Sequence, residues 1–277
     1  MSDQPEAPAA VAAENEHSDA LPHPAAPIGA APAAPVTDAD DATGTGPTDT
    51  GSAGAEPLGA DSTGAEEAAS WAQHEEEAPR TVFADLGLSE ALLKGVEDAG
   101  YLHPTPIQEQ AIPIVLMGRD VLGCAQTGTG KTASFVLPMM DILAGSRAKA
   151  RMPRSLILEP TRELALQVAE NFVKYGQHMK LNHALLIGGE SMNEQTEALN
   201  QGVDVLIATP GRLLDLFERG RVMLADCKVL VIDEADRMLD MGFIPDVERI
   251  VSMLPRMRQT LFFSATMAPE IRRLADA

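Results

Sequence analysis

The chain has 277 residues and a formal net charge of −20 at pH 7. That charge excludes a strongly basic nucleic-acid-binding protein, so any contact with nucleic acid must be a local patch. No apolar run of about 18 residues and no basic, apolar leader occurs, so we expect no transmembrane helix and no secretory signal. The two cysteines, Cys124 and Cys227, match neither a disulfide framework nor a zinc site. We expect both to be buried free thiols in a cytoplasmic, monomeric protein.

The first 80 residues differ in composition from the rest of the chain. They hold 16 acidic residues against one basic residue, Arg80, and 10 of the 20 prolines. Only five of them are Val, Leu, Ile or Phe. Such a segment buries too little apolar surface to offset the entropy of ordering. We therefore predict a disordered acidic Ala/Pro-rich tail over residues 1–80 and one globular domain over residues 81–277.

Two helices are predicted at the start of this domain. Ser89 caps the first, and Gly100 closes it. The rigid turn Pro104-Thr105-Pro106 leads into the second, over residues 108–116.

Six short apolar runs follow, and most are nearly continuous, as is typical of strands that are buried on both faces. They span residues 121–125, 155–158, 184–187, 203–208, 229–232 and 260–263. Helices that begin after Thr161, Ser191 and Thr209 separate several of them. This alternation predicts an α/β fold with a parallel sheet and right-handed crossovers. Polar and small residues gather where the runs end, and ligands bind at that edge of such sheets.

The strongest motif follows the first apolar run and opens a helix. It reads Ala125-Gln126-Thr127-Gly128-Thr129-Gly130-Lys131-Thr132, with Ala125 where the general phosphate-loop pattern has Gly. Its backbone N–H groups and the helix dipole would hold phosphate oxygens. Lys131 would reach the β- and γ-phosphates, and the Thr132 hydroxyl would bind Mg²⁺. The alternative is a Gly-rich turn in front of a buried helix.

A second motif ends the apolar run at residues 229–232. It reads Asp233-Glu234-Ala235-Asp236. Asp233 would hold Mg²⁺, directly or through water, and Glu234 would orient and deprotonate an attacking water molecule. A solvated acidic loop is the alternative for this cluster taken alone, but the phosphate loop favours a nucleotide-hydrolysis site.

Together these motifs resemble the N-terminal RecA-like P-loop domain of DEAD-box ATP-dependent RNA helicases. The resemblance covers residues 81–277 and not the tail. Further family motifs occur in order: Gly100-Tyr101-Leu102-His103-Pro104-Thr105-Pro106-Ile107-Gln108, Pro160-Thr161-Arg162-Glu163-Leu164, Gly188-Gly189, Thr209-Pro210-Gly211-Arg212 and Ser264-Ala265-Thr266. The sequence around Met241-Gly242-Phe243 is similar to the bacterial RhlE-like branch.

The resemblance implies ATP and Mg²⁺ as cofactors and roles for further residues. Gln108 would read the adenine edge, Phe83 would pack against the base, and Thr105 belongs to the same adenine motif. Asp236, Ser264 and Thr266 would couple the hydrolysis site to the rest of the protein. A third group would contact the RNA backbone with little sequence preference: Pro160, Thr161, Arg162, Gly188, Gly189, Thr209, Pro210, Gly211 and Arg212.

The resemblance also implies a second RecA-like domain, which the family places after a linker and which supplies arginines to the ATP site. This sequence stops at Ala277. We therefore expect a fragment that binds ATP or ADP, hydrolyses ATP poorly and does not unwind RNA alone. Two functions stay open: the ATP-binding half of an RNA-dependent ATPase and helicase, or a nucleotide- and RNA-binding module without turnover.

A basic stretch lies between the helix after the phosphate loop and the second apolar run. It contains Arg147, Lys149, Arg151 and Arg154. This basic stretch either lies along bound RNA or is a solvated loop. Runs of charged residues are usually solvated, which favours the second alternative.

The tail leads to the first prediction. A tethered polyanion has a high effective concentration near a basic RNA-binding patch, and would compete with RNA phosphates. Deleting residues 1–80 should tighten RNA binding at low salt and matter less at high salt, because the Debye length is only about 10 Å at 0.1 M. Binding isotherms measured with and without the tail check this. Isotherms that coincide at every salt concentration would leave a purely solubilising tail.

Overall fold

The computed structural model describes residues 80–145 and 147–276. The predicted tail lies outside the described residues except for Arg80. The elements, in chain order, are η1 (Phe83–Leu86), α2 (Glu90–Asp98), α3 (Pro106–Leu116), β1 (Val121–Cys124), α4 (Lys131–Leu143), β2 (Ser155–Leu158), α5 (Arg162–Tyr175), β3 (His183–Leu186), α6 (Met192–Gln201), β4 (Val205–Ala208), α7 (Pro210–Glu218), β5 (Val229–Ile232), α8 (Ala235–Asp240), α9 (Ile244–Met253), β6 (Gln259–Ser264) and α10 (Pro269–Asp276). None of the helices in this described part has the length and apolarity needed to cross a membrane.

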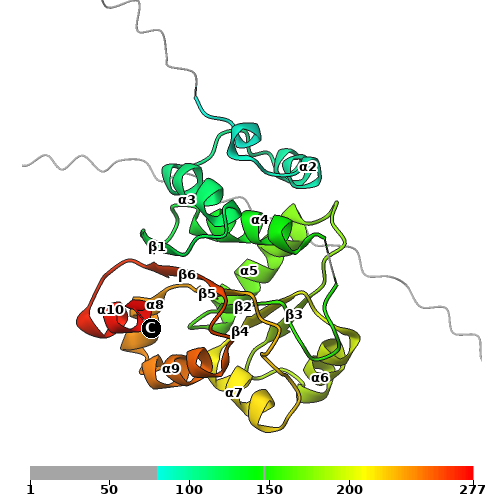
Figure 1. Cartoon of the computed structure of the whole chain (residues 1–277), viewed down its shortest axis with the longest axis vertical. Coiled ribbons are helices and arrows are strands. Elements are labelled where there is room, and N and C mark those ends of the chain that lie inside the picture. The colour runs from blue at the N-terminus through cyan, green and yellow to red at the C-terminus, as the bar shows by residue number, and fades with distance from the viewer. Residues whose placement is uncertain (1–79, 146, 277) are drawn as a thin grey trace, which may run out of the picture. The chain divides into compact units, whose positions relative to one another are not determined.

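The six strands form one sheet in the order β1-β6-β5-β2-β4-β3 (Figure 1). Every neighbouring pair is parallel. The predicted parallel α/β fold is confirmed, and each observed strand overlaps a predicted run. The order places β1, β6 and β5 side by side in one half of the sheet, and β2, β4 and β3 in the other.

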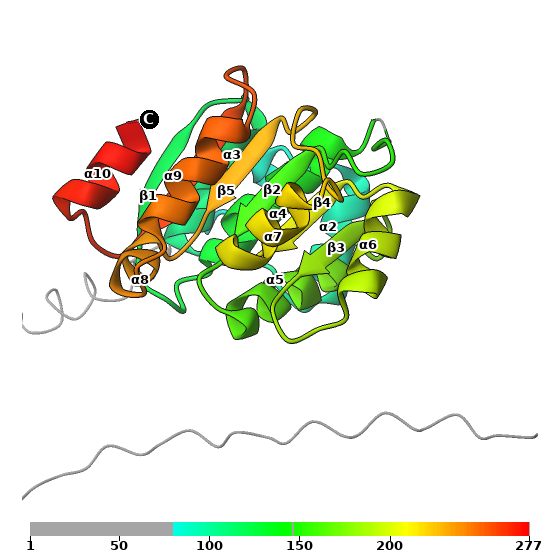
Figure 2. The same ribbon diagram turned by 90° about the horizontal axis from the view of Figure 1, so that it is seen from below.

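Successive side chains of a strand point to opposite faces of the sheet, and they pack into two hydrophobic cores, one on each face. In β2, Ile157 packs into the core shared with α2, α3, α4 and α5. Its neighbours Leu156 and Leu158 pack into the core formed with α6 to α10. The register aligns Ile157 with Val231 and Ile207, so the same face continues across three strands. Helices therefore cover both faces, as Figures 1 and 2 show.

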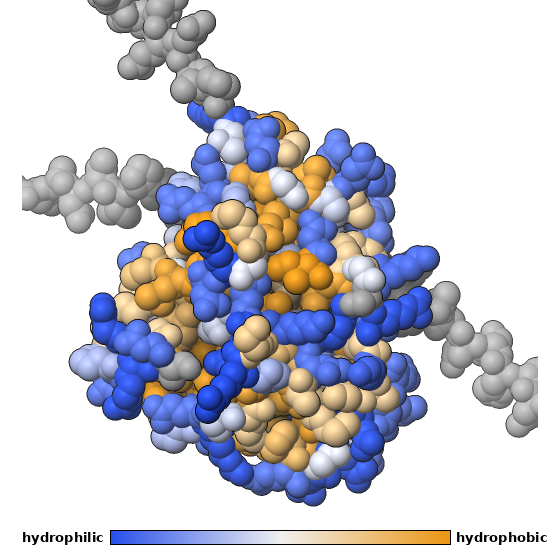
Figure 3. Space-filling view, viewed as in Figure 1, coloured by the Kyte–Doolittle hydropathy of each residue, from blue (hydrophilic) through white to orange (hydrophobic). Residues whose placement is uncertain are grey.

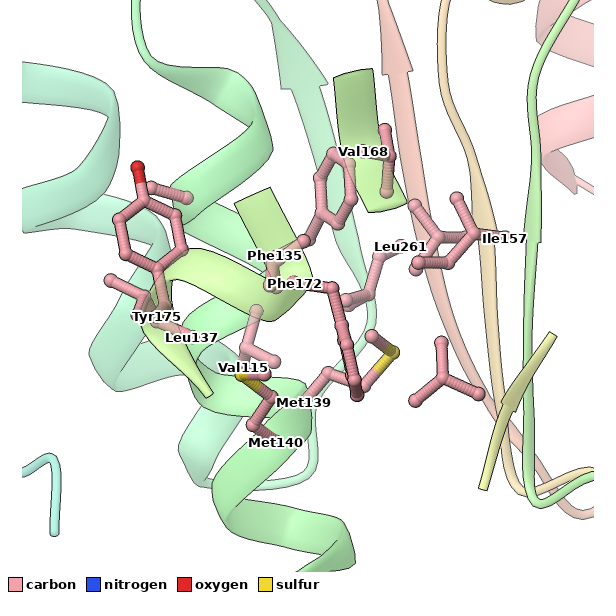
Figure 4. Packing of buried hydrophobic residues seen from close by; sticks show 14 of the residues in the cluster. Val115, Phe135, Leu137, Met139, Met140, Ile157, Val168, Phe172, Tyr175 and Leu261 are labelled. Atoms are coloured by element: carbon pink, nitrogen blue, oxygen red, sulfur yellow. The ribbon is translucent and has the colours of Figure 1, made fainter. Parts of the chain in front are cut away.

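An aromatic contact fixes α4 against the sheet. The rings of Phe135 in α4 and Phe263 in β6 lie 5.4 Å apart at an interplanar angle of 43°. Gly123 of β1 permits this approach, since a Cβ atom there would collide with the Phe263 ring. Phe135 stands among the packed apolar side chains of Figure 4. The contact therefore holds β1 and α4, the two elements on either side of the loop at residues 125–130, against β6.

The edge strand β1 corrects two predictions. It is not buried on both faces: the Leu122 side chain is 58% exposed. The Cys124 thiol, expected to be buried, is exposed, whereas Cys227 is buried and burial raises its pKa to about 12. The cause is the position of β1 at the end of the sheet order. The periodicity of a sequence cannot distinguish an edge strand from a central one.

The surface of the domain is mixed in polarity. Figure 3 shows patches of apolar residues that lie between hydrophilic residues on the face in view.

Arg154 corrects the predicted solvated loop. Its side chain is buried, and its Nε and Nη2 atoms donate to Asp204 Oδ1 at 3.0 and 2.6 Å. Asp204 also accepts hydrogen bonds from the backbone N–H groups of Ala148 and Asn182. One buried carboxylate thus joins the segments that precede β2, β3 and β4, at the end of the sheet away from the predicted ligand edge.

Asp204→Ala should therefore destabilise the domain. It removes the carboxylate that pairs with the buried Arg154 guanidinium and accepts from two backbone N–H groups, a change that costs about 3–5 kcal/mol in comparable buried pairs. Urea unfolding followed by circular dichroism measures the loss of unfolding free energy. Asp215→Ala is the control, because Asp215 pairs with Arg219 on the exposed surface of α7. Equal unfolding midpoints for the two variants would contradict this account.

Candidate active site

The loop between β1 and α4 has the backbone geometry of an anion-binding turn. Gly128 and Gly130 have φ angles of 86° and 85°, in the left-handed region that favours glycine. Gly130 is also the N-cap of α4, so the first N–H groups of that helix face the loop. Thr129 Oγ1 donates to Gln126 O at 2.8 Å and braces the turn. A phosphate group is the ligand that such a turn at a helix N-terminus fits.

Lys131, the first residue of α4, is buried against the acidic cluster. Its Nζ atom lies 2.5 Å from Glu234 Oε1 and 3.4 Å from Asp233 Oδ1. Burial lowers the pKa of Lys131, but the two carboxylates outweigh that effect and the net shift is upward. Burial raises the pKa of Asp233 to about 6, against the lowering by Lys131. Thr127 Oγ1 also donates to Glu234 Oε1, at 3.2 Å.

Glu234 adopts a strained backbone conformation. Its φ of 52° and ψ of 46° lie in the left-handed region, which is uncommon for a residue with a side chain. Its N–H donates to Asp233 Oδ1 at 2.9 Å, which stabilises the turn between β5 and α8. The strain has a local consequence: it points the Glu234 carboxylate at the lysine of the phosphate loop.

A third carboxyl group lies beside this cluster. Glu159 directly follows β2, its side chain is 1% exposed, and neither oxygen has a hydrogen-bond partner among the residues that the structure describes. Burial raises the pKa of Glu159 well above its usual value, and the Asp233 and Glu234 carboxylates raise it further. Glu159 belongs to none of the motifs in the sequence. Its only signal was an acidic side chain at the end of an apolar strand, just ahead of Pro160.

These groups line one cavity of about 460 Å³. Its polar part is formed by the phosphate loop with Lys131, Thr132, Glu159, Asp233 and Glu234, and Phe83, Tyr101 and Tyr175 contribute aromatic walls. Backbone N–H donors, one ammonium group and an apolar section suit a nucleotide. Hydroxyl and carboxyl oxygens are the ligands that Mg²⁺ prefers. The residues therefore fit a nucleotide–Mg²⁺ complex.

Gln108 joins the adenine motif to the phosphate loop. Its Nε2 donates to Gly130 O at 3.0 Å, and its Oε1 accepts from Thr105 N at 2.9 Å. Each amide end retains one further hydrogen-bonding position, so a contact to a base edge remains available without breaking either bond. Phe83 lies in the cavity wall and is largely buried. The Thr105 hydroxyl oxygen is buried without a partner among the described residues.

The residues expected to couple the site to the rest of the protein are in contact. Ser264 Oγ, at the end of β6, accepts from Asp236 N at 3.2 Å. Thr266 Oγ1 donates to Asp236 Oδ2 at 3.5 Å. The pairing of β5 with β6 brings these segments together, although 28 residues separate Asp236 from Ser264.

The expected RNA-contacting residues lie at the ends of β2, β3 and β4. Arg162 Nη2 lies 3.2 Å from Glu190 Oε1, and its guanidinium occupies the place that a Cβ on Gly189 would fill. Arg212 Nη1 donates to Glu190 O at 3.2 Å and to Gln195 Oε1 at 3.1 Å. Glu190 thus contacts both arginines beside the Gly188-Gly189 turn, Arg162 through its carboxylate and Arg212 through its backbone carbonyl. Glu190 was not among the residues predicted from the sequence.

Most of the other residues expected to contact RNA lie at or near the N-termini of α5 and α7. Thr161 is the N-cap of α5, and its hydroxyl accepts from Leu164 N at 3.3 Å. Pro160 directly follows Glu159 at the end of β2. Thr209 N donates to Leu186 O at 3.0 Å, Pro210 opens α7, and Gly211 has open space where a Cβ would stand. The open space leaves this backbone accessible to a large ligand.

Comparison with known proteins gives consistent results. The family model described as DEAD/DEAH box helicase matches residues 105–274. A DEAD-box ATP-dependent RNA helicase RhpA from Helicobacter pylori is 48% identical over 194 residues, which cover 70% of this chain and 39% of that protein. An ATP-dependent RNA helicase DeaD from Escherichia coli is 50% identical over 195 residues, which cover 70% of this chain and 30% of that protein. The chain thus spans well under half of these relatives.

A solved structure shares the fold. The crystal structure of a DEAD box protein from the hyperthermophile Methanococcus jannaschii superposes with a TM-score of 0.65 at 38% sequence identity. The match covers 70% of this chain and 53% of that one.

Gly130→Ala tests the geometry of the loop. A Cβ at this position would stand 2.5 Å from Gln108 Nε2 and 3.1 Å from Thr105 Oγ1, on a backbone with positive φ. The loop or the Gln108 side chain must therefore shift, and we expect adenine-nucleotide binding to weaken more than tenfold, that is by over about 1.4 kcal/mol. Isothermal titration calorimetry with ADP measures this. Gly145→Ala, which has open space and no positive φ, should bind as the parent does.

Proposed function

The chain belongs to the DEAD/DEAH box helicase family, and on that basis we propose that residues 81–277 form the ATP-binding RecA-like half of an ATP-dependent RNA helicase. The observation that carries this proposal is the buried cluster of Lys131 with Asp233 and Glu234 beside a glycine-rich helix start. A buried ammonium between two carboxylates at a phosphate-binding turn matches the requirements of phosphoryl transfer.

In this proposal the cavity holds a nucleotide with its cation. Backbone N–H groups of the loop from Gln126 through Thr127, Gly128, Thr129 and Gly130 bind phosphate oxygens, whereas the Ala125 N–H, at the start of the loop, donates to Ser264 O. Lys131 contacts the β- and γ-phosphates, and Thr132 and Asp233 hold Mg²⁺, directly or through water. When bound, the cation neutralises charge on the phosphates.

The adenine end determines which nucleotide binds. Gln108 retains one free N–H and one free lone pair, which match the adjacent acceptor and donor of adenine. Phe83 packs against the base from the cavity wall. Guanine presents a different pattern on the same edge, so the site prefers ATP.

Hydrolysis begins when the Lys131 ammonium breaks its ion pair with Glu234 and binds the phosphates instead. The freed Glu234 carboxylate then takes a proton from a water molecule, and the water oxygen attacks the γ-phosphorus. The bond from that phosphorus to the β–γ bridging oxygen breaks, which yields ADP and inorganic phosphate. Asp236, with Ser264 and Thr266, transmits the change to β6.

RNA binds at the other half of the sheet edge. Arg162 and Arg212 contact the RNA backbone, supported by the N–H groups and small residues at Gly188, Gly189, Thr209 and Gly211. Backbone contacts carry no base code, so binding has little sequence preference. Unwinding and rapid turnover require a second RecA-like domain, whose arginines complete the ATP site; such an arginine is worth about 10³–10⁵ in rate.

Two substitutions separate nucleotide binding from hydrolysis. Lys131→Ala should weaken ATP binding to this chain, because it removes a ground-state contact, whereas Glu234→Gln should spare binding and abolish phosphate release. Calorimetry with ATP measures binding. Phosphate release with and without RNA, measured on this chain and on a version that carries a second RecA-like domain, reports hydrolysis.

Lys228→Ala is the matched control, since Lys228 is exposed and precedes β5 at the opposite end of the sheet. Parent-level phosphate release by Glu234→Gln would refute the role of Glu234. Nucleotide and RNA binding without release, even with the second domain attached, would favour the binding module over the enzyme.

A further inference from the structure

Glu159 is a buried acid at the cavity that the proposed reaction does not use. Its side chain is 1% exposed, it lines the cavity with Lys131, Asp233 and Glu234, and both carboxyl oxygens lack a partner among the described residues. Burying a carboxyl group without a hydrogen bond costs several kcal/mol in ordinary cores. A ligand that enters the cavity would offset this cost if it brought hydrogen-bond donors or positive charge.

The sheet register explains why Glu159 faces the acidic cluster. Leu158 of β2 aligns with Ile232 of β5, so Glu159 and Asp233 are the next residues at adjacent strand ends. Asp233 N donates to Leu158 O at 3.2 Å, and Glu159 N donates to Ala208 O at 3.0 Å. The backbone at both positions is therefore held on the sheet ladder, which fixes the two residues next to each other at adjacent strand ends.

The chemistry of the possible ligands selects one. Phosphate oxygens offer no donor and would repel a third carboxylate. Lys131 is already engaged with Glu234 and Asp233. A hydrated divalent cation offers both positive charge and water O–H donors, and Mg²⁺ usually keeps several of its waters when bound to proteins.

We propose that Glu159 is a third carboxyl group that holds the hydrated Mg²⁺ ion of the nucleotide complex, through water, beside Asp233 and Glu234. We place the contact through water because, in the described ranges, no three His, Cys, Asp or Glu side chains are grouped so that they could hold a metal ion together. The inference rests on the proposed function.

The test compares nucleotide affinity with and without Mg²⁺. Calorimetry or fluorescence titration of this chain with a non-hydrolysable ATP analogue, in excess Mg²⁺ and in EDTA, gives the affinity gain due to the cation. In Glu159→Gln that gain should fall about tenfold, the scale on which partners in the hydration shell affect metal affinity. Glu159→Asp, which keeps the carboxyl group, should retain more of the gain. Glu170→Gln, an exposed acid on α5, should leave it unchanged.

The outcomes distinguish this inference from the proposed function. An unchanged gain in Glu159→Gln overturns the role of Glu159 while leaving nucleotide binding intact. Failure of the parent chain to bind the analogue in either condition, or binding that Mg²⁺ does not strengthen, overturns the proposed function and this inference with it. If Glu159→Gln unfolds at a lower temperature and binds in neither condition, the Glu159→Asp gain decides: a gain smaller than that of the parent, with binding in EDTA unchanged, supports the role, and a gain equal to that of the parent overturns it.

Discussion

The Lys131 ammonium, buried against the Asp233 and Glu234 carboxylates, is the interaction on which the rest of the structure depends. A single charge in that position would be too costly to bury, and the three together are tolerable only because each faces an opposite charge. The arrangement requires β1 with its loop, β5 with its acidic turn, and the left-handed backbone at Glu234 to converge on one point. The sheet order, with β6 between β1 and β5, satisfies that requirement.

The same order divides the edge of the sheet into two regions. The phosphate loop and the acidic turn follow β1 and β5, and Ser264 ends β6. Arg162, Gly189 and Arg212 belong to the segments after β2, β3 and β4. The two regions meet where β5 pairs with β2. There a short segment carries Glu159 toward the cavity and, three residues later, Arg162 toward Glu190.

Stability and chemistry occupy opposite ends of the strands. At the amino ends, Asp204 is fully hydrogen-bonded to Arg154 and to backbone N–H groups, so this buried charge is satisfied without any ligand. At the carboxyl ends, the Glu159 carboxyl and the Thr105 hydroxyl are buried without partners among the described residues. Polar groups that have no partner within the protein are those that a ligand can use, which is why the proposed ligand site lies at the second end and not at the first.

The sequence by itself determined the fold class and most of the candidate site, because these depend on local patterns. Apolar runs located all six strands, and the spacing of Gly128, Gly130 and Lys131 located the phosphate loop before any contact was known. Only the tertiary structure decided which strands lie at the edge, and so why Cys124 is exposed while Cys227 is buried. It also decided that Arg154 is a buried partner of Asp204, that Glu190 holds two arginines, and that Glu159 joins Asp233 and Glu234. These facts depend on the order and register of parallel strands that are distant in sequence, and periodicity along a single strand carries no information about its neighbours.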